Sequence, residues 1–252
     1  MVDAGKPASR GKKCFSDEMI QSCLHTMETG DTEELFEIIP RIGVLRDPRF
    51  HEPLVRLLGG GDLKKREFAA YSMGAMADRA FLEPLKKAFL EARKIKGFGS
   101  NELQIAIIEA IGSIGDDAVV EFFLPTLKNC CDQKASRTGK GAAKNAARMG
   151  KWIIESLGAI AQQGGGRSLE ALIELTEHPD PEIQSLALPE ISVAYWHRPN
   201  EVDKATLEKI YRLTVHPVPL VAESALAALQ NLADVGCKQA EAYFADSPEY
   251  ED

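Results

Sequence analysis

A short pattern of residues recurs along this chain, and it limits the possible fold more than any other feature of the sequence. In its clearest copies a glycine stands among apolar residues, and the pattern is centred at residues 43, 74, 112, 158, 192 and 230. The spacings are 31, 38, 46, 34 and 38 residues. Repeats that each form one helix–turn–helix unit recur every ~30–47 residues. The sequence therefore predicts an array of about six helix pairs.

Four copies of the pattern are clear and two are weaker. The clear copies are Arg41–Leu45, Ser72–Met76, Ala110–Ile114 and Ser156–Ile160, and the weaker ones are Glu190–Ala194 and Ala228–Leu232. Each copy closes the second helix of a pair, here called the B helix, and a first helix, the A helix, precedes it. The apolar spacing predicts A helices at about 16–28, 48–58, 79–94, 117–131, 167–177 and 203–215.

Turn residues fall between the A and B helices, where the array requires them. Gly30-Asp31 and the segment Gly59–Asp62 each supply a helix stop followed by an N-cap acceptor. The segments His178–Pro181 and His216–Pro219 hold the same place in two later pairs, 38 residues apart. This coincidence indicates a repeat rather than a site built from two histidines.

One helix pair is too small to bury its own apolar face, but stacked pairs share a continuous core. The apolar content of 44% is sufficient for such a core. We therefore predict an all-α protein, a right-handed α-solenoid of about six helix pairs over residues 15–237 with an insertion at about 132–143. A disordered basic arm is expected at 1–14 and an acidic tail at 238–252.

The turn sequences also resemble a known family. Asp180–Ile183 followed by Ala187-Leu188, and Gly112–Asp116 between two pairs, are similar to the transitions of HEAT repeats of the bacterial PBS-lyase-like type. The resemblance covers about residues 16–236 and implies HEAT-like helix pairs. Proteins of this fold include scaffolds, adaptors, lyase subunits and a few enzymes, so the resemblance is specific for the fold and not for the function.

The B helices of a solenoid usually line its concave, binding side. Positions 10, 7 and 3 residues before each pattern centre should form an exposed ridge, which is mostly acidic with one basic patch. A charged helix face is also typical of ordinary solvated surface. Our hypothesis is that the ridge holds a basic or mixed-charge polypeptide. The residues expected to bind it are Lys64, Glu67, Tyr71, Glu102, Glu109, Lys151 and Glu155.

A basic stretch interrupts the fourth pair, where the spacing is longest. Residues 128–151 carry seven basic side chains and one acid, in a chain of net charge −8. We expect this insertion either to be a solvated loop or to bind an acidic protein surface, a phosphate-bearing ligand or RNA. Its predicted binding residues are Lys134, Arg137, Lys140, Lys144 and Arg148.

The sequence gives little support to catalysis, and we expect no enzyme activity, cofactor or metal. A di-iron site of the kind some HEAT-like enzymes carry needs several His-Glu pairs, whereas the chain has one, His51-Glu52. The chain has five cysteines, an odd number, and they are widely spaced. This pattern favours reduced thiols over a framework of disulfides. No apolar run approaches the ~20 residues of a membrane span, and no apolar segment of a secretory signal follows the basic N-terminus. A cytoplasmic location is therefore expected.

The function predicted is that of a non-catalytic scaffold or adaptor that binds another protein. The resemblance implies one alternative, a subunit similar to those of bilin lyases. Nucleic-acid binding through residues 128–151 is the other alternative. Self-association as a homodimer is also considered, because Met19, Ile20 and Leu24 share one face of the first A helix.

Overall fold

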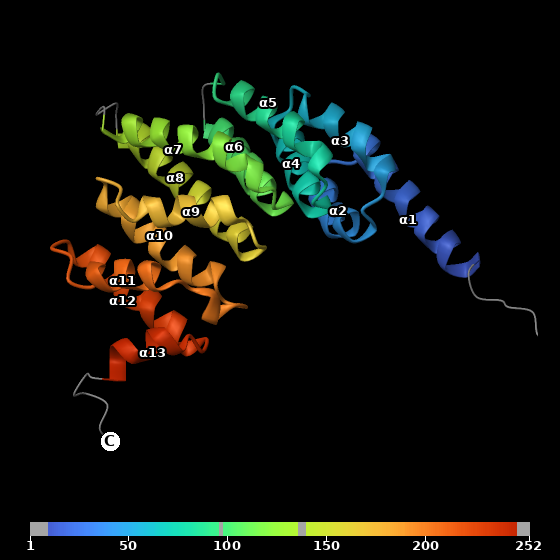
Figure 1. The fold of residues 1–252 in the computed structure, drawn as a ribbon. Coiled ribbons are helices and arrows are strands. Elements are labelled where there is room, and N and C mark those ends of the chain that lie inside the picture. The colour runs from blue at the N-terminus through green and yellow to red at the C-terminus, as the bar shows by residue number, and fades with distance from the viewer. Residues whose placement is uncertain (1–9, 96–97, 136–139, 246–252) are drawn as a thin grey trace, which may run out of the picture. The chain divides into compact units, whose positions relative to one another are not determined.

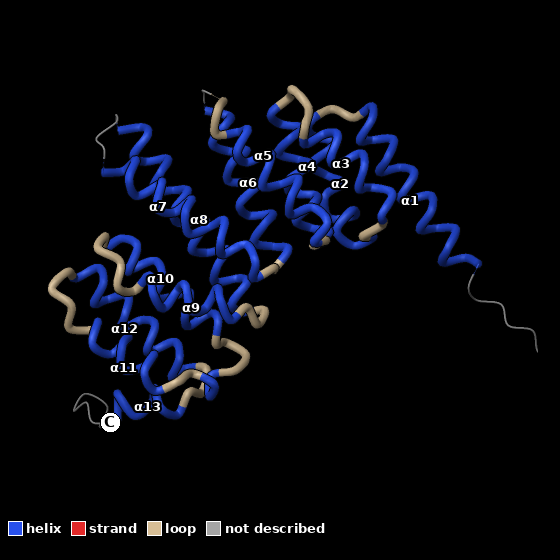
Figure 2. Tube along the Cα trace, turned by 45° about the horizontal axis from the view of Figure 1, so that its top comes forward, coloured by secondary structure: helices blue, strands red, loops and turns tan. Residues whose placement is uncertain are grey.

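The computed structural model describes residues 10–95, 98–135 and 140–245, and all regular structure in these residues is helical (Figures 1 and 2). The chain divides into two compact units, Met1–Ala110 and Ile111–Asp252. Within each unit, helices pack on their neighbours in sequence, as in a repeat array. The predicted all-α repeat class is confirmed, whereas the right-handedness of the array stays a prediction. None of the helices in the described residues is long and apolar enough to cross a membrane.

The first unit contains three helix pairs. Its A helices are α1 (Arg10–Thr29), α3 (His51–Leu58) and α5 (Leu82–Ala92), and its B helices are α2 (Thr32–Leu45), α4 (Leu63–Met76) and α6 (Phe98–Ile114). The unit boundary falls within the last turns of α6. Two short 3-10 helices, η1 (Pro48–Phe50) and η2 (Arg79–Phe81), lead into α3 and α5. The observed pairs follow the predicted segments closely.

The second unit contains three further pairs and one additional helix. Its A helices are α7 (Val120–Ala135), α9 (Gly166–Leu175) and α11 (Lys204–Leu213), and its B helices are α8 (Lys140–Gln162), α10 (Pro181–Ala194) and α12 (Pro219–Asp234). The 3-10 helices η3 (Asp117–Val119) and η4 (Pro199–Glu201) precede α7 and α11, and α13 (Lys238–Ala245) follows α12. Helix α10 packs on α8 and α12, and α13 packs on α12 and α11 (Figure 1).

An aspartate four residues after the pattern centre starts three of the A helices. Each carboxylate accepts a hydrogen bond of 2.9 Å from the backbone N–H two residues later and so caps a 3-10 turn. The capping residues are Asp47, Asp78 and Asp116. The turn then places a buried apolar side chain at its last position, namely Phe50, Phe81 and Val119. This spacing of Asp and apolar residue is a repeat signal in its own right.

Glycines at the pattern centres allow neighbouring B helices to approach closely. A Cβ built on Gly74 would lie 2.9 Å from the Ala110 Cα, and one on Gly112 would lie 2.7 Å from the Ser156 Cβ. Contacts this short between a new Cβ and another helix are not tolerated without a shift. The small residues of the pattern are therefore required by packing.

In the second unit, a carboxylate from one A helix segment caps the next A helix. Asp117 accepts hydrogen bonds from the Ser168 N–H and hydroxyl, both 2.7 Å, and from the Arg167 N–H at 2.8 Å. The α9 N-cap, Gly165, has no side chain to do this, and Ser168 is fully buried. Although burial opposes the charge of Asp117, the bonds from Ser168 and Arg167 hold the pKa of its carboxyl below the ordinary value.

The helices extend beyond the predicted domain limits at three places. Helix α1 begins at Arg10, within the segment expected to be a disordered arm. Helix α7 continues to Ala135 and α8 begins at Lys140, so most of the predicted insertion at 132–143 is helical. The stretch contains three Ala and two Lys residues, which favour helix, and α7 and α8 pack on each other. Residues 136–139 lie outside the described part.

Helix α13 occupies the first half of the segment expected to be an acidic tail. An isolated helix of eight residues is marginal in water. Packing stabilises α13, because Ala240 is fully buried and the Tyr243 ring stacks on Tyr211 with 4.6 Å between centroids. Residues 246–252 lie outside the described part.

Candidate binding surface on the B helices

In the first unit, the predicted ridge on α4 is only partly exposed. The Lys64 side chain is 57% exposed, and its Nζ lies 2.7 Å from Oε2 of Glu67, whose side chain is only 5% exposed. The expectation that Glu67 points into solvent is therefore wrong. Residues 66–70 of α4 are all buried, because neighbouring helices surround this part of α4 and Lys64 folds over the carboxylate. The second oxygen of Glu67, Oε1, has no hydrogen-bond partner among the described residues.

Aromatic side chains accompany this ion pair. The Phe36 ring on α2 meets Tyr71 on α4 edge to face, with 6.2 Å between centroids, and meets Phe68 similarly at 6.3 Å. Phe36 and Tyr71 are both partly exposed. Tyr71, one of the predicted ridge residues, thus lies at a partly exposed surface that offers both apolar area and a hydroxyl.

The two remaining acidic ridge residues of the first unit, Glu102 and Glu109, are partly exposed on α6. Both residues have interactions within the protein. They contribute negative charge to the B-helix surface without being isolated side chains.

In the second unit, the ridge residues Lys151 and Glu155 form an ion pair one turn apart on α8. Lys151 Nζ lies 3.5 Å from Glu155 Oε1, and the side chains are 55% and 36% exposed. A pair of this kind, open to solvent, contributes little to stability, typically ~0.3–0.5 kcal/mol. Both charges are therefore available to a partner at small cost.

A third charged residue of this surface, Glu190 on α10, was not among the predicted site residues. Its carboxyl group lies against Gly158 of α8. The charges of Glu155 and Lys151 both act on the pKa of this carboxyl group. Burial, together with the negative charge of Glu155 and despite Lys151, raises the pKa of Glu190 to about 7. A sequence signal was present, because Glu190 lies two residues before its pattern centre, where the clear copies have Ala, Ser or Arg.

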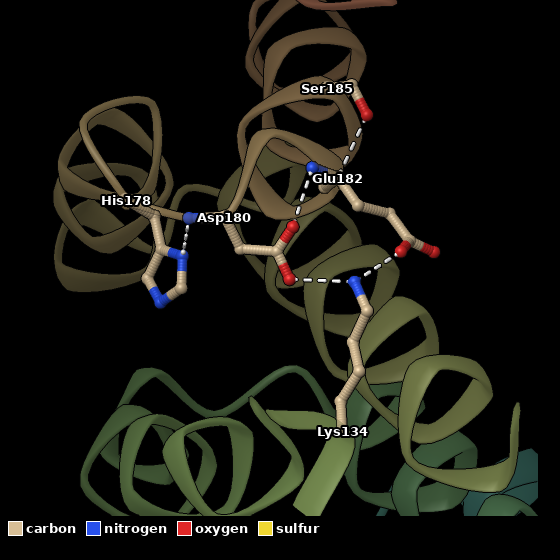
Figure 3. Close-up of polar contacts among 5 residues, drawn as sticks. All are labelled: Lys134, His178, Asp180, Glu182 and Ser185. Atoms are coloured by element: carbon tan, nitrogen blue, oxygen red, sulfur yellow. Dashed lines mark hydrogen bonds and ion pairs between the residues drawn. The ribbon is translucent and has the colours of Figure 1, made fainter. Parts of the chain in front are cut away.

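The basic insertion does not present all of its predicted binding residues. Figure 3 shows Lys134 of α7 reaching the first turn of α10, where Nζ lies 2.7 Å from Asp180 Oδ2 and 2.5 Å from Glu182 Oε2. Burial opposes the charge of Lys134, but these two hydrogen bonds raise the pKa of its ammonium group overall. Lys134 is thus a clamp between α7 and α10, already neutralised from within the chain. Lys144 and Arg148 are exposed on α8, whereas Arg137 and the side chain of Lys140 lie outside the described part.

Local hydrogen bonds position the acceptors of the clamp. Asp180 Oδ1 accepts from the Glu182 N–H at 3.0 Å, and the Asp180 N–H donates to His178 Nδ1 at 3.1 Å (Figure 3). His216 Nδ1 accepts from the Val218 N–H at the same distance. The two His-Pro turns therefore use their imidazoles to order the turn before a B helix.

A small hollow lies beside the clamp. It is lined mainly by apolar side chains around Gly150 of α8, including Leu127, Cys130 and Ile183. The space that a water-sized sphere can occupy in it is only about 10 Å³, far below the ~300–1,000 Å³ of ordinary ligand pockets. The neighbouring Cys131 thiol has a raised pKa, chiefly because it is buried, so it is a poor nucleophile at neutral pH.

The first unit has a wider and more polar groove between α1 and α3. Its empty volume is about 1,120 Å³, and its lining mixes both charges, with His25 and Glu28 from α1 and Glu52 and Arg56 from α3. Arg49 at its edge is held by Asp17 at 2.9 Å and Asp47 at 2.8 Å. In the described residues, no three His, Cys, Asp or Glu side chains are placed to hold a metal ion.

Comparison with known proteins gives similarity in structure only. No protein-family model matches the chain, and no curated protein sequence matches it. An engineered protein from the Northeast Structural Genomics Consortium is 21% identical, with 86% of this chain and 97% of that chain covered and a TM-score of 0.42. A designed armadillo repeat protein is 15% identical, with 84% and 98% covered and a TM-score of 0.36. The narrower resemblance to PBS-lyase-like HEAT repeats stays a prediction.

Proposed function

We propose that this chain is a non-catalytic scaffold or adaptor of HEAT-like repeats that binds another protein through the exposed faces of its B helices. The partner segment is basic or of mixed charge. The proposal depends chiefly on one observation: within the described part of the chain, Glu155 and Glu190 on the adjacent helices α8 and α10 share one nearby lysine, Lys151. A cationic side chain from a partner would balance the second carboxylate.

The aromatic surface of the first unit supports the same function. Phe36 and Tyr71 present rigid, partly exposed rings beside the Lys64–Glu67 pair. Aromatic residues are enriched at protein interfaces, because they bury large areas while losing little conformational entropy. A polypeptide on this face would find an apolar contact and charged groups close together.

Charge reversal on the two faces of the repeats tests the proposal. The B-face variant carries Glu109→Lys and Glu155→Lys, while the control carries Glu170→Lys and Glu174→Lys on the exposed side of α9. Glu67 is left unchanged because its carboxylate is buried. Both variants gain the same charge, and circular dichroism checks that both are folded.

The readout is affinity capture from native lysate, with and without nuclease, quantified by mass spectrometry. We expect the wild type and the α9 control to capture the same nuclease-resistant proteins, and the B-face variant to capture at least tenfold less of them. Equal capture by all three would contradict the proposal. Loss of every specific partner on nuclease treatment would instead favour nucleic acid as the ligand.

A further inference from the structure

The contact between Glu190 and Gly158 differs from the other contacts at the pattern centres. Gly43 faces Ala75 and Gly112 faces Ser156, so a small residue lies opposite each glycine. Opposite Gly158 lies a carboxyl group: a Cβ on Gly158 would clash with Glu190 Oε2 and lie 2.9 Å from its Cδ. The missing side chain of Gly158 leaves the space that the Glu190 carboxyl occupies between α8 and α10.

The groups around this carboxyl do not balance the negative charge that it carries when it is ionised. Helix α8 supplies two charged groups, Glu155, which repels the carboxylate, and Lys151, which attracts it. Lys151 is already paired with Glu155 at 3.5 Å. Helices α9 and α12 also pack on α10, and in the described residues they add no charged group to the surroundings of Glu190. An ionised Glu190 is thus only partly exposed to water and lies beside a like charge, which is unfavourable.

We propose that the Glu190–Gly158 contact is a proton-operated switch in the packing of α10 on α8. Protonated, the carboxyl group stays in the space left by Gly158 and the two helices are closely packed. Ionised, it is driven toward solvent and the contact loosens. This inference goes beyond the proposed function: both draw on Glu155, Lys151 and Glu190, but the switch concerns the packing of α10 on α8 and needs no partner.

The direction of the effect follows from proton linkage. The folded-state pKa of about 7 lies above the ordinary value of 4.5. The closed contact therefore contributes its full stability below about pH 4.5, and that contribution is lost as the pH rises through 7. The contact between α8 and α10 therefore weakens between about pH 4.5 and pH 7, and it is fully loosened at higher pH.

Amide hydrogen exchange on the full chain tests the switch. After correction for the intrinsic pH dependence of exchange, opening that frees Glu190 should become up to ~30-fold more favourable between pH 5.5 and 8.5, given pKa values of about 7 and 4.5 for the closed and open forms. We expect this loss of protection in α10 and in the last half of α8. Glu190→Gln should abolish the pH dependence, while the control Glu174→Gln on exposed α9 should retain it.

Two further measurements keep the test decisive. Carbon-13 NMR titration of the Glu190 carboxyl in the wild type should give a midpoint near pH 7, and Glu155→Gln should lower that midpoint by removing the like charge. A wild-type midpoint below pH 5, or identical exchange profiles for the wild type and Glu190→Gln, would overturn the proposal. The carboxyl titration does not depend on whether any variant folds.

Discussion

Removing the Asp117 carboxylate should destabilise the second unit by more than an ordinary helix cap does. Asp117 accepts three hydrogen bonds at the start of α9, and two of them come from fully buried Ser168. In Asp117→Ala the Ser168 N–H and hydroxyl would lose their acceptor out of reach of water. Each buried unsatisfied donor costs ~1–3 kcal/mol, whereas an ordinary N-cap residue contributes ~1 kcal/mol. We therefore expect a loss of about 3 kcal/mol.

The chain provides a reporter confined to this unit. Its two tryptophans, Trp152 and Trp196, both lie between Ile111 and Asp252, so urea unfolding followed by tryptophan fluorescence reports the second unit. Asp117→Asn, which keeps one acceptor oxygen, should lose less than Asp117→Ala. The control Asp132→Ala, at an exposed position on α7, should stay within about 0.5 kcal/mol of the wild type.

The pH dependence gives a second check on the same residue. Hydrogen bonds from Ser168 and Arg167 outweigh burial and hold the pKa of Asp117 below its ordinary value of 3.8. The contribution of Asp117 to the free energy of unfolding is therefore present above about pH 3.8 and is lost as the pH falls through the lowered pKa. The stability difference between the wild type and Asp117→Asn should shrink in strong acid. A loss below 0.5 kcal/mol for Asp117→Ala at pH 7 would refute the reasoning.

Three other substitutions test the packing and the charges. Gly74→Ala should cost ~1–2 kcal/mol by thermal unfolding, because overpacking against the Ala110 backbone exceeds the gain in helix propensity; the open position Gly61 should accept Ala within 0.5 kcal/mol. Lys134→Met should lower the free energy of unfolding by ~1 kcal/mol in the fluorescence assay, and by less at high salt, because it removes two ion pairs. The control Lys204→Met, which breaks a single exposed ion pair, should lower it hardly at all. Arg66→Met should leave thermal stability unchanged or raise it by up to ~1 kcal/mol, because Nε and Nη2 of this buried arginine have no hydrogen-bond partner in the described residues. A loss above 1 kcal/mol for Arg66→Met would contradict that prediction.

The helix pairs were predictable because their signals are local. Apolar spacing and turn residues fix where each pair begins and ends, so the A helix expected at 48–58 corresponds to η1 and α3, and the one expected at 203–215 corresponds to α11. The helical insertion and α13 were missed for another reason. The longest spacing between pattern centres and a basic stretch indicate an inserted loop, and an acidic composition indicates a tail, but packing on α8 and α12 decides the outcome.

The candidate site was less predictable, because its properties depend on contacts between distant residues. Lys134 reads as a free basic residue, yet it pairs with Asp180 and Glu182, 46 and 48 positions later. Glu67 reads as an exposed acid, yet it is buried beneath Lys64. The unusual ionisation of Glu190 requires Gly158 and Glu155 on another helix. Charge patterns in the sequence locate the right helices but not the state of each side chain.

Carboxyl footprinting of the native complex can decide whether a protein partner binds the B-helix faces. The complex captured from lysate and the free protein would be labelled with a carbodiimide and glycine ethyl ester, and the labelling of each glutamate compared by mass spectrometry. We expect the partner to lower the labelling of Glu155 and Glu109 severalfold and to leave that of Glu170 and Glu174 on α9 unchanged. Protection of the α9 glutamates with unaltered labelling of Glu155 and Glu109 would contradict it.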